Sequence, residues 1–517
     1  MPQATKPAVR SRPTLASIIA TVGPASHDPA IIRELIAAGV AVFRLNFSHG
    51  TFAEHEERLR NIRASAAELG LAVGVLGDLP GPKIRVGVLH EGVEVAAGGT
   101  LVLACQAHEA SRSPDGAPVL PCTYAPLARE VEAGHRVLIN DGAIRGVAAP
   151  RAAGDPDAWL RVRVEVGGLI TSRKGINLPD SRISAPALTD LDRECVEWAV
   201  RHGVDFLALS FVRSADEVRQ LRRLVGTLCP IDDPGDALQA GAAIPVIAKI
   251  ERPAALDDLD AIIEAADGVM VARGDLGVEM DLAQVPVVQR TLIAKADEWG
   301  KPCIVATQML ETMISSSVPT RAEASDVANA IFDGADAVML SGETAAGRHP
   351  VLVVRTMRRI VEAAESAAAR DGHAPSPPRR LVESRYRTAA LAHGAWHIAK
   401  DLGAVLVVCW SQRGGTARYL SQNGFRVPIF AYSSDQPSTR RMSLLKGVVP
   451  LHAPVPEGGS LRQWNQLVER DLLSRGWAAP GEPILLIAGR PLGRPGSTNA
   501  VAIHYVSNPV TGFMAHP

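Results

Sequence analysis

The amino-acid sequence predicts an α/β protein in which eight parallel strands close into a barrel, with a small β domain inserted into the barrel and a separate α/β domain after it. Three observations support this fold. Short apolar runs ending on polar groups recur along residues 14–370, residues 87–185 interrupt them with a different pattern, and a proline-rich stretch precedes a fresh alternation of helices and strands.

Each apolar run is typical of a strand buried on both faces and followed by a helix, as in a (β/α)8 TIM barrel. Because the carboxyl ends of parallel strands line one mouth of such a barrel, the polar residues that close the runs are expected to meet there. The runs are ASIIATVGP, VAVFRLNFSHG, AVGVLGDL, VDFLALSFVR, IPVIAKIERP, GVMVARGDLGVE, PCIVATQMLETM and AVMLSGETAAGRHP.

The barrel is expected to take residues 14–86 and 186–370, after a flexible leader of residues 1–13. Asp28 is suited to cap the first helix, with Pro29 at the first helical position. The second helix is expected to end on Gly70, which tolerates the left-handed conformation of a helix terminus.

Residues 87–185 carry short alternating apolar and polar runs with many Gly and Pro, typical of a small antiparallel β domain. An insertion between the third and fourth strands of a barrel lies at the catalytic mouth. It therefore acts either as a lid over the site or as a decoration without a catalytic role.

The stretch HAPSPPRR is expected to be a linker, and residues 381–510 a C-terminal α/β domain with its own core. RTAALAHGAWHIAKDLG and TARYLSQNG are expected to be helices. The expected strands are AVLVVCWS, VPIFAYS, PILLIAG and VAIHYV.

Composition restricts the class of function. A net charge of -1 and 47% hydrophobic residues indicate a globular protein without a bias toward nucleic acid or membrane surfaces. The N-terminus lacks the apolar core of a secretory signal and no apolar run reaches membrane-spanning length, so a cytoplasmic location is expected. The six cysteines have no metal-binding spacing and receive no role.

The residues at the strand ends favour phosphoryl transfer. Two carboxylates on adjacent strands with a lysine beside them suit a Mg²⁺ ion and a migrating phosphoryl group. A single lysine or glutamate at a strand end is more often a solvated or ion-paired surface group, but eight coordinated strand ends argue against that interpretation for the whole set. Glu343 could simply pair with an arginine to brace the last loop. The pool contains the carboxylates Asp78, Glu251 and Asp275, the cations Arg44, Arg85 and Lys249, and the hydroxyls Ser48, Thr307 and Ser341.

The segment ARGDLG suits an anion. A glycine between Arg273 and Asp275 at the start of a helix allows backbone N–H groups to approach a substrate carboxylate closely.

With these residues in view, the chain resembles the pyruvate kinase family from about Ser17 to Val506. The motifs that carry the resemblance are RLNFSHG, KGINLPD, AKIERP, MVARGDLGVE and the run from ATQMLETM to SGETAAGRHP. The resemblance implies transfer of the phosphoryl group of phosphoenolpyruvate to ADP, giving pyruvate and ATP, the last step of glycolysis.

The same resemblance implies roles for individual residues. Lys249 would stabilise the phosphoryl group in flight, and Arg44 would hold it. Glu251 and Asp275 would bind Mg²⁺ or Mn²⁺. Gly274, Asp275 and Thr307 would bind the substrate carboxylate, and Ser341 would relay a proton to the enolate. The nucleotide would face Asn46, His49, Arg85 and Lys174.

One position departs from the commonest pattern of the family. Many members bind K⁺ at the positions of Asn46, Ser48, Asp78 and Leu79, and have a glutamate where this chain has Lys83. The resemblance therefore predicts that K⁺ is not required, with the Lys83 ammonium supplying the charge. Alternatively, Lys83 is a surface residue and the K⁺ site is intact.

The C-terminal domain resembles the effector domain of the family, and a homotetramer is expected by analogy. A phosphorylated effector would bind the loop Ser411, Arg413, Gly414, Gly415 and Thr416, with residues 489–499 facing it. Two other functions stay open. A metal-dependent barrel lyase or aldolase acting on phosphoenolpyruvate or pyruvate would share the carboxylates, and a catalytically silent relative would serve as a binding scaffold.

Overall fold

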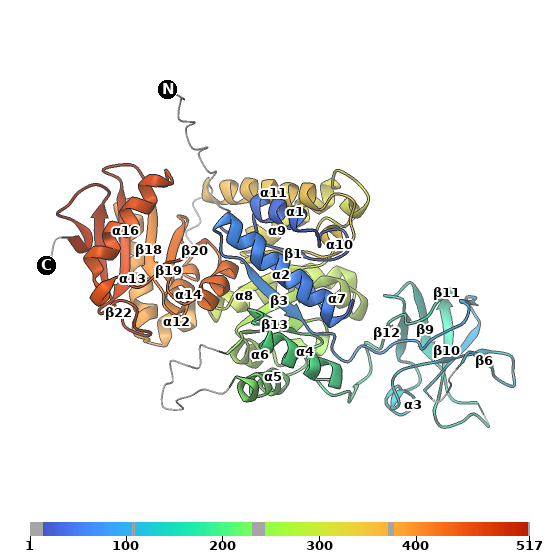
Figure 1. Cartoon of the computed structure of the whole chain (residues 1–517). Helices are drawn as coiled ribbons and strands as arrows, with labels where there is room; N and C mark the ends of the chain where they lie inside the picture. Colours follow the sequence, from blue (N-terminus) through green and yellow to red (C-terminus); the bar gives the residue numbers. More distant parts are fainter. Residues whose placement is uncertain are drawn as a thin grey trace.

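The computed structural model describes residues 14–105, 107, 109–152, 154–229, 243–370 and 377–514. The expected leader, residues 1–13, lies outside the described residues. The barrel occupies the centre of the molecule, the inserted β domain projects from one side and the C-terminal domain packs on the opposite side (Figure 1).

All eight predicted barrel strands are present, and they close into one parallel barrel in the order β1-β17-β16-β15-β14-β13-β3-β2. The predicted fold class is therefore confirmed. The strands are β1 (Ser17–Thr21), β2 (Val40–Asn46), β3 (Gly74–Asp78), β13 (Phe206–Leu209), β14 (Val246–Ile250), β15 (Gly268–Ala272), β16 (Cys303–Ala306) and β17 (Ala337–Leu340).

Helices cover the outside of the barrel, and their termini follow the predicted caps. Asp28 accepts a hydrogen bond from Ala30 N at the start of the first helix, and Gly70 ends the second with φ 61°. The helices outside the barrel are α1 (Pro29–Ala38), α2 (Phe52–Leu69), α4 (Asp190–Arg201), α5 (Ala215–Leu228), α6 (Leu259–Ala265), α8 (Val285–Glu298), α9 (Arg321–Phe332) and α11 (Pro350–Arg370). Two further helices lie at the strand ends: α7 (Arg273–Glu279) begins directly after β15, and α10 (Gly342–Ala345) begins one residue after β17.

The barrel interior has its own apolar cluster, separate from the layer between strands and helices. Its members include Ile19, Phe206, Met270 and Met339, and one further member, Leu444, comes from the C-terminal domain. Leu444 is 1% exposed and belongs to the 3-10 turn η5 (Met442–Leu444). The C-terminal domain thus completes the apolar core at the end of the barrel opposite the strand carboxyl ends.

The insert is built from a seven-stranded sheet of order β12-β8-β9-β10-β5-β7-β6 and a two-stranded sheet of β11 and β4, with one large apolar cluster and a second small one of Val102, Ala104, Ala117 and Val119. Its elements are β4 (Val93–Val95), β5 (Thr100–Ala104), β6 (Ser111–Arg112), β7 (Pro118–Pro121), α3 (Leu127–Glu130), β8 (Arg136–Ile139), β9 (Ile144–Ala148), β10 (Trp159–Val166), β11 (Gly168–Ile170) and β12 (Ile176–Asn177).

The C-terminal domain is a five-stranded sheet of order β20-β19-β18-β21-β22 with helices on both faces. Helix α12 begins at Arg379, inside the expected linker, of which residues 373–376 lie outside the described part of the chain. The elements are α12 (Arg379–Glu383), α13 (Arg387–Leu402), β18 (Leu406–Trp410), α14 (Gly415–Ser421), β19 (Ile429–Ser433), α15 (Gln436–Arg441), β20 (Val448–His452), α16 (Leu461–Ser474), β21 (Pro483–Gly489) and β22 (Thr498–Tyr505).

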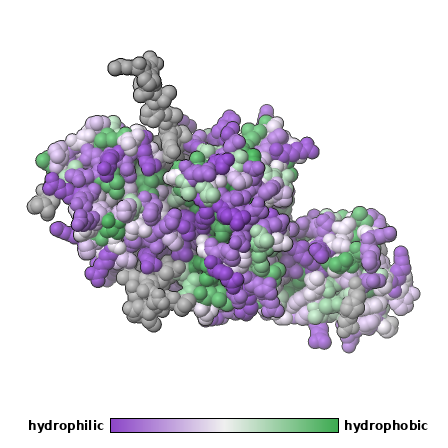
Figure 2. Space-filling view, in the orientation of Figure 1, coloured by the Kyte–Doolittle hydropathy of each residue, from purple (hydrophilic) through white to green (hydrophobic). Residues whose placement is uncertain are grey.

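Most of the molecular face seen in Figure 2 is hydrophilic, with apolar side chains in scattered small patches. Within the described residues, no helix combines the length and the apolar character needed to cross a membrane.

Candidate active site

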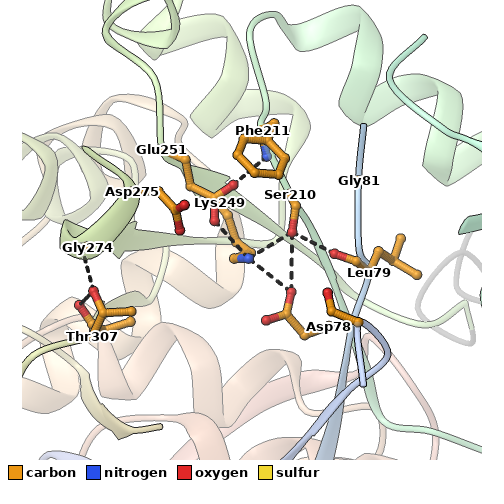
Figure 3. A network of polar contacts seen from close by, with 12 residues as sticks. Asp78, Leu79, Gly81, Ser210, Phe211, Lys249, Glu251, Gly274, Asp275 and Thr307 are labelled. Atoms are coloured by element: carbon orange, nitrogen blue, oxygen red, sulfur yellow. Dashed lines mark hydrogen bonds and ion pairs between the residues drawn. The ribbon is translucent and has the colours of Figure 1, made fainter. Parts of the chain in front are cut away.

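Lys249 lies at the carboxyl end of β14, and three oxygens surround its ammonium group. Nζ lies 2.8 Å from Glu251 Oε1 and 3.1 Å from Asp78 Oδ1, and it donates a 2.7 Å hydrogen bond to Ser210 Oγ (Figure 3). Burial alone would lower the pKa of the ammonium, but the carboxylates of Asp78 and Glu251 outweigh it and raise this pKa. Lys249 therefore carries a fixed positive charge at neutral pH.

Two carboxylates, Glu251 and Asp275, follow the neighbouring strands β14 and β15. Glu251 is 1% exposed, and its Oε2 accepts a 2.7 Å hydrogen bond from Phe211 N. Burial raises the pKa of Glu251, Lys249 opposes that change, and the negative charge of Asp275 adds to it. Asp275 lies in the first turn of α7, directly after β15, and its side chain is 28% exposed.

Two oxygen ligands and a water-accessible side suit a divalent cation. The described residues contain no cluster of three or more His, Cys, Asp or Glu that would enclose a metal completely. Mg²⁺ in phosphoryl-transfer sites typically keeps few protein ligands and completes its coordination with water and phosphate oxygens. A cation between Glu251 and Asp275 would also relieve the repulsion that raises the pKa of Glu251. Glu251 and Asp275 therefore fit a bound Mg²⁺ ion.

Asp78 connects Lys249 to Arg44. Arg44 Nε donates a 2.7 Å hydrogen bond to Asp78 Oδ2, and its Nη1 donates to Thr21 Oγ1 over 3.2 Å. Asp78 is 1% exposed, and burial alone would raise its pKa. Lys249 and Arg44 reverse this effect and lower the pKa of Asp78. The carboxylate holds the two cations in fixed positions on adjacent sides of the mouth.

Gly274 and Thr307, predicted to share a substrate carboxylate, lie in contact. Gly274 N donates to Thr307 Oγ1 over 2.7 Å, and that hydroxyl donates to Ala306 O. Thr307 has φ 64° and Gln308 has φ 54°, a conformation that β-branched and bulky residues rarely adopt. The strained turn brings the hydroxyl of Thr307 to the N-terminus of α7.

Three polar groups near the strand ends stabilise loops. Arg273 contacts Asp326 and donates to the carbonyl oxygen of Thr307 over 2.9 Å. Arg213 lies beyond the end of β13, where it pairs with Glu217 at 2.6 Å. Glu343 braces the last loop, as one of the two sequence interpretations held. Its partners are the backbone N–H groups of Leu310 and Ser341, in place of the arginine considered above.

The expected nucleotide-facing residues come from β2 and from the base of the insert. Asn46 Oδ1 accepts a hydrogen bond from Ser48 N, and His49 follows in the same turn. Burial lowers the pKa of His49, and the positive charges of Arg85, Arg44 and Lys83 lower it further.

Arg85 and Lys174 lie where the chain enters and leaves the insert. Arg85 forms an isolated antiparallel bridge with Gly175, and its Nη1 donates to Arg173 O over 3.0 Å. Lys174 O accepts a hydrogen bond from Val86 N. The two cations are therefore carried by adjacent, hydrogen-bonded segments.

Lys83 faces the mouth, with its side chain 26% exposed. Its Nζ lies 3.7 Å from Asp275 Oδ1 and 4.0 Å from Asp141 Oδ1 of the insert. Among the described ion pairs, the oxygens of Asp78 pair with Arg44 and Lys249. The ammonium of Lys83 thus lies on the Asp275 side of the mouth.

The two remaining predicted residues differ in their surroundings. Leu79 is 1% exposed in the outer core, and its carbonyl oxygen accepts a 2.6 Å hydrogen bond from Ser210 Oγ. The Ser341 hydroxyl is buried and has no hydrogen-bond partner among the described residues. Ser341 N donates to Glu343 Oε2.

Ser210 and Phe211 were missed by the sequence analysis. Ser210 is the first polar residue after β13, so its position at a strand end was a usable signal. Phe211 contributes only a backbone N–H, presented by a left-handed conformation with φ 56°. No side-chain pattern predicts such a contact.

A second concave site lies between the C-terminal domain and the amino end of the barrel strands. It is a cavity of about 610 Å³ lined by the predicted effector loop, by residues 493–498 and by Phe206 and Ile244 of the barrel. Thr416 Oγ1 lies 2.7 Å from Thr498 Oγ1, so the two expected loops do face each other. The charged residues that line the cavity are Arg222, Asp267, Arg413, Arg418, Arg441 and Arg494.

Comparison with known proteins agrees with this geometry. Residues 14–354 match the family model described as pyruvate kinase, barrel domain, and residues 389–504 match the model described as pyruvate kinase, alpha/beta domain. A pyruvate kinase of Mycobacterium intracellulare is 40% identical over 491 residues, covering 95% of this chain and 98% of the relative. One from Geobacillus stearothermophilus is 38% identical over 495 residues, covering 95% and 80%.

The two family models match in order along one chain, and the relatives align over nearly its whole length. The protein therefore belongs to the pyruvate kinase family, whose members transfer the phosphoryl group of phosphoenolpyruvate to ADP.

Proposed function

We propose that this chain forms pyruvate and ATP from phosphoenolpyruvate and ADP, and that Lys249 is the residue that stabilises the phosphoryl group in transfer. One observation carries the proposal: a buried ammonium with a raised pKa lies 2.8 Å from one carboxylate of a two-carboxylate cation site. Charge fixed before the reaction lowers the barrier because no solvent has to reorganise around it.

Glu251 and Asp275 would hold Mg²⁺, or Mn²⁺ in its place. The bound cation would neutralise charge on the phosphate and the developing enolate. The chain itself orients the two carboxylates, through Phe211 N on Glu251 and the first turn of α7 under Asp275.

The substrate would lie across the mouth between α7 and β2. Its carboxylate would bind the N–H groups of Gly274 and Asp275 with the Thr307 hydroxyl, which already contacts Gly274 N at 2.7 Å. Its phosphate would face Arg44, whose guanidinium is held by Asp78.

The nucleotide would enter on the side of the insert. The positive charges of Arg85, Arg44 and Lys83 all lower the pKa of His49, and a group of cations of this kind suits a diphosphate. Lys174 would close over it from the insert, which then acts as a lid. Ser341, whose buried hydroxyl has no partner among the described residues, would relay the proton that converts the enolate to pyruvate.

Lys83 would make the enzyme independent of K⁺. The positive charge of Lys83 lowers the pKa of His49, and its Nζ lies 3.7 Å from Asp275 Oδ1. Both observations argue against the alternative of a surface lysine that leaves the K⁺ site intact. Leu79 contributes an apolar, buried side chain at a position where the K⁺-binding members offer a ligand.

The cavity beside the effector loop would bind a phosphorylated effector. Arginines outnumber carboxylates among its described lining residues, which favours an anion. A homotetramer is supported by β22, which lies at the end of its sheet and exposes Ile503 and Tyr505 at 41% and 38%. An edge strand of this kind is suited to pair with a second copy. Size-exclusion chromatography with light scattering measures the assembly.

The deciding experiment measures pyruvate formation from phosphoenolpyruvate and ADP with Mg²⁺, first without K⁺ and then with it. Comparable rates in both support the reaction and the role of Lys83. Activity only with K⁺ keeps the reaction and rejects the role of Lys83. Folded protein without activity in either buffer, and still inactive with sugar phosphates or nucleoside monophosphates added, contradicts the proposal. Phosphoenolpyruvate consumed without ADP would favour the lyase.

A further inference from the structure

The insert is joined to the catalytic barrel by a buried hydrogen bond between Asn177 and Glu279. Asn177 Nδ2 donates to Glu279 Oε1 over 2.8 Å. Asn177 closes β12 at the base of the insert, and Glu279 is the last residue of α7. The two residues are 5% and 3% exposed.

Glu279 occupies a position that disfavours a carboxylate. Burial raises its pKa, and the charges of Arg252 and Arg136 only partly offset that change. The C-terminus of a helix also carries partial negative charge, which repels an acidic side chain. Leucine would be the expected residue if this position served packing alone. The side-chain oxygen of Glu279 is therefore explained by the hydrogen bond that it accepts from Asn177.

The contact joins two pieces of the catalytic machinery. On one side, Glu279 lies one helical turn after Asp275 on α7, so the two carboxylates share a face of that helix. On the other side, Asn177 lies three residues after Lys174 and two after Gly175, which pairs with Arg85. The base of the insert is thus tied to the helix that presents Asp275.

A second contact lies at the other edge of the same junction. Lys83 Nζ reaches both Asp275 and Asp141, and a Cβ added at Gly175 would stand 3.0 Å from Lys83 Cε. The turn that carries Asp141 is wound left-handed at Asn140, Asp141 and Gly142. This second contact is long and partly exposed, whereas the Asn177–Glu279 bond is short and buried. The Asn177–Glu279 hydrogen bond is therefore the better candidate for the contact that positions the insert.

We propose that Glu279 is a positioning residue that, through Asn177, holds the insert at the distance from α7 at which Arg85 and Lys174 reach the nucleotide. The inference rests on the proposed nucleotide roles of those two cations. Glu279 touches neither substrate nor the reacting atoms. Replacement of Glu279 should weaken the binding of ADP and leave the binding of phosphoenolpyruvate unchanged.

Three single variants and one control test the Asn177–Glu279 contact. Asn177→Ala and Glu279→Ala each remove the bond. The Oδ1 atom of Asn177 is buried without a partner, so its removal leaves no new unsatisfied acceptor on that residue. Glu279→Gln retains the acceptor oxygen and the volume of the side chain. Tyr124→Phe is the matched control, because its hydroxyl contacts Glu130 at 2.6 Å and Ser184 at 3.3 Å, neither of which belongs to α7.

The readouts separate positioning from general damage. We expect each alanine variant to raise the KM for ADP about tenfold, and the Kd for phosphoenolpyruvate, measured by fluorescence titration with Mg²⁺, to change less than twofold. Hydrogen exchange should accelerate in residues 83–86 and 174–178. Glu279→Gln should return the KM for ADP to within about threefold of the parent. The double alanine variant should be no worse than either single variant.

Three results would overturn the inference. One is an unchanged KM for ADP in both alanine variants, and the second is an equal loss of affinity for both substrates. The third is a Tyr124→Phe variant that behaves like Asn177→Ala. If the alanine variants do not fold, Glu279→Gln with Asn177→Ser supplies the same comparison. Failure of the proposed function would be visible separately, as absence of pyruvate formation in the parent enzyme.

Discussion

Ser210 Oγ lies 2.7 Å from Lys249 Nζ and 2.6 Å from the carbonyl oxygen of Leu79, so one hydroxyl links the ammonium of Lys249 to the backbone directly after β3. The hydroxyl cannot donate to the ammonium, because Lys249 has donors only. It therefore accepts from Lys249 and donates to Leu79. The same hydroxyl lies 3.4 Å from Asp78 Oδ1, so Ser210 contacts both the ammonium and one of its carboxylate partners.

Lys249→Met should lower kcat about a hundredfold or more and leave phosphoenolpyruvate binding largely intact. The charge acts mainly in the transition state, so its loss affects turnover more than ground-state affinity. Steady-state kinetics together with a binding titration would measure both effects. Near-normal turnover in a variant with unchanged circular dichroism would reject the role of Lys249.

Ser210→Ala should lower kcat about tenfold with little change in either KM. A hydrogen bond to a charged group contributes about 1.5–3 kcal/mol, and its loss allows the ammonium to move between Asp78 and Glu251. Ser474→Ala is the control, since that hydroxyl only caps the exposed end of α16. Equal kinetics for the two serine variants would mean that Asp78 and Glu251 hold Lys249 without help.

His55→Phe should reduce the loss of stability that follows acidification. His55 is 2% exposed and packs edge-on against Phe47, with ring centroids 5.0 Å apart. Burial lowers its pKa to about 4. The unfolded chain, with a histidine pKa of about 6.5, therefore binds the proton more readily. The stability this residue contributes is complete above pH 6.5 and is lost as pH falls through about 4.

Urea unfolding of the parent and of His55→Phe at pH 7.5, 6 and 5 measures this effect. The difference in unfolding free energy between the two proteins should shift in favour of the variant by about 1–3 kcal/mol over that range. A difference independent of pH would show that His55 does not titrate in this interval.

Leu444→Ala should destabilise the barrel as well as the C-terminal domain. The side chain is 1% exposed within the barrel's interior cluster, and such truncations typically cost about 2–5 kcal/mol. Scanning calorimetry should show the barrel transition moving to lower temperature. Leu282→Ala, at a residue that is 71% exposed, should leave it in place. If two transitions were resolved and only that of the C-terminal domain shifted, Leu444 would contribute little to the stability of the barrel.

The barrel was predictable from sequence because strands buried on both faces must be continuously apolar, and each of the eight left such a run. Strand β20 escaped detection for the opposite reason. It lies at the sheet edge, contains Pro450 and is only partly buried, so it lacks the pattern of a central strand. Helices α15 and α16 were likewise not assigned.

The candidate site was predictable as a set of residues but not as a set of contacts. Lys249, Glu251, Asp78 and Arg44 meet because they lie at the carboxyl ends of β14, β3 and β2, which open on the same mouth of the barrel, with β13 between β14 and β3. Pairs such as Asn177 and Glu279 are distant in sequence and lie on different domains. Their meeting depends on how the insert packs, which no local pattern encodes. The position of Lys83 beside Asp275 likewise depends on how the insert packs and could not be predicted from a local pattern.

Strand β3 pairs directly with β13, with Leu76 opposite Phe206 and Gly77 opposite Leu207, although the whole insert separates them in sequence. The barrel closes as if the two strands were consecutive. Loop-closure entropy grows so slowly that residues 79–205 cost only about 2 kcal/mol more than a ten-residue connection. Natural variation in the length of this insert, or its exchange for another module, should therefore leave the architecture of the barrel intact while changing which second substrate it admits.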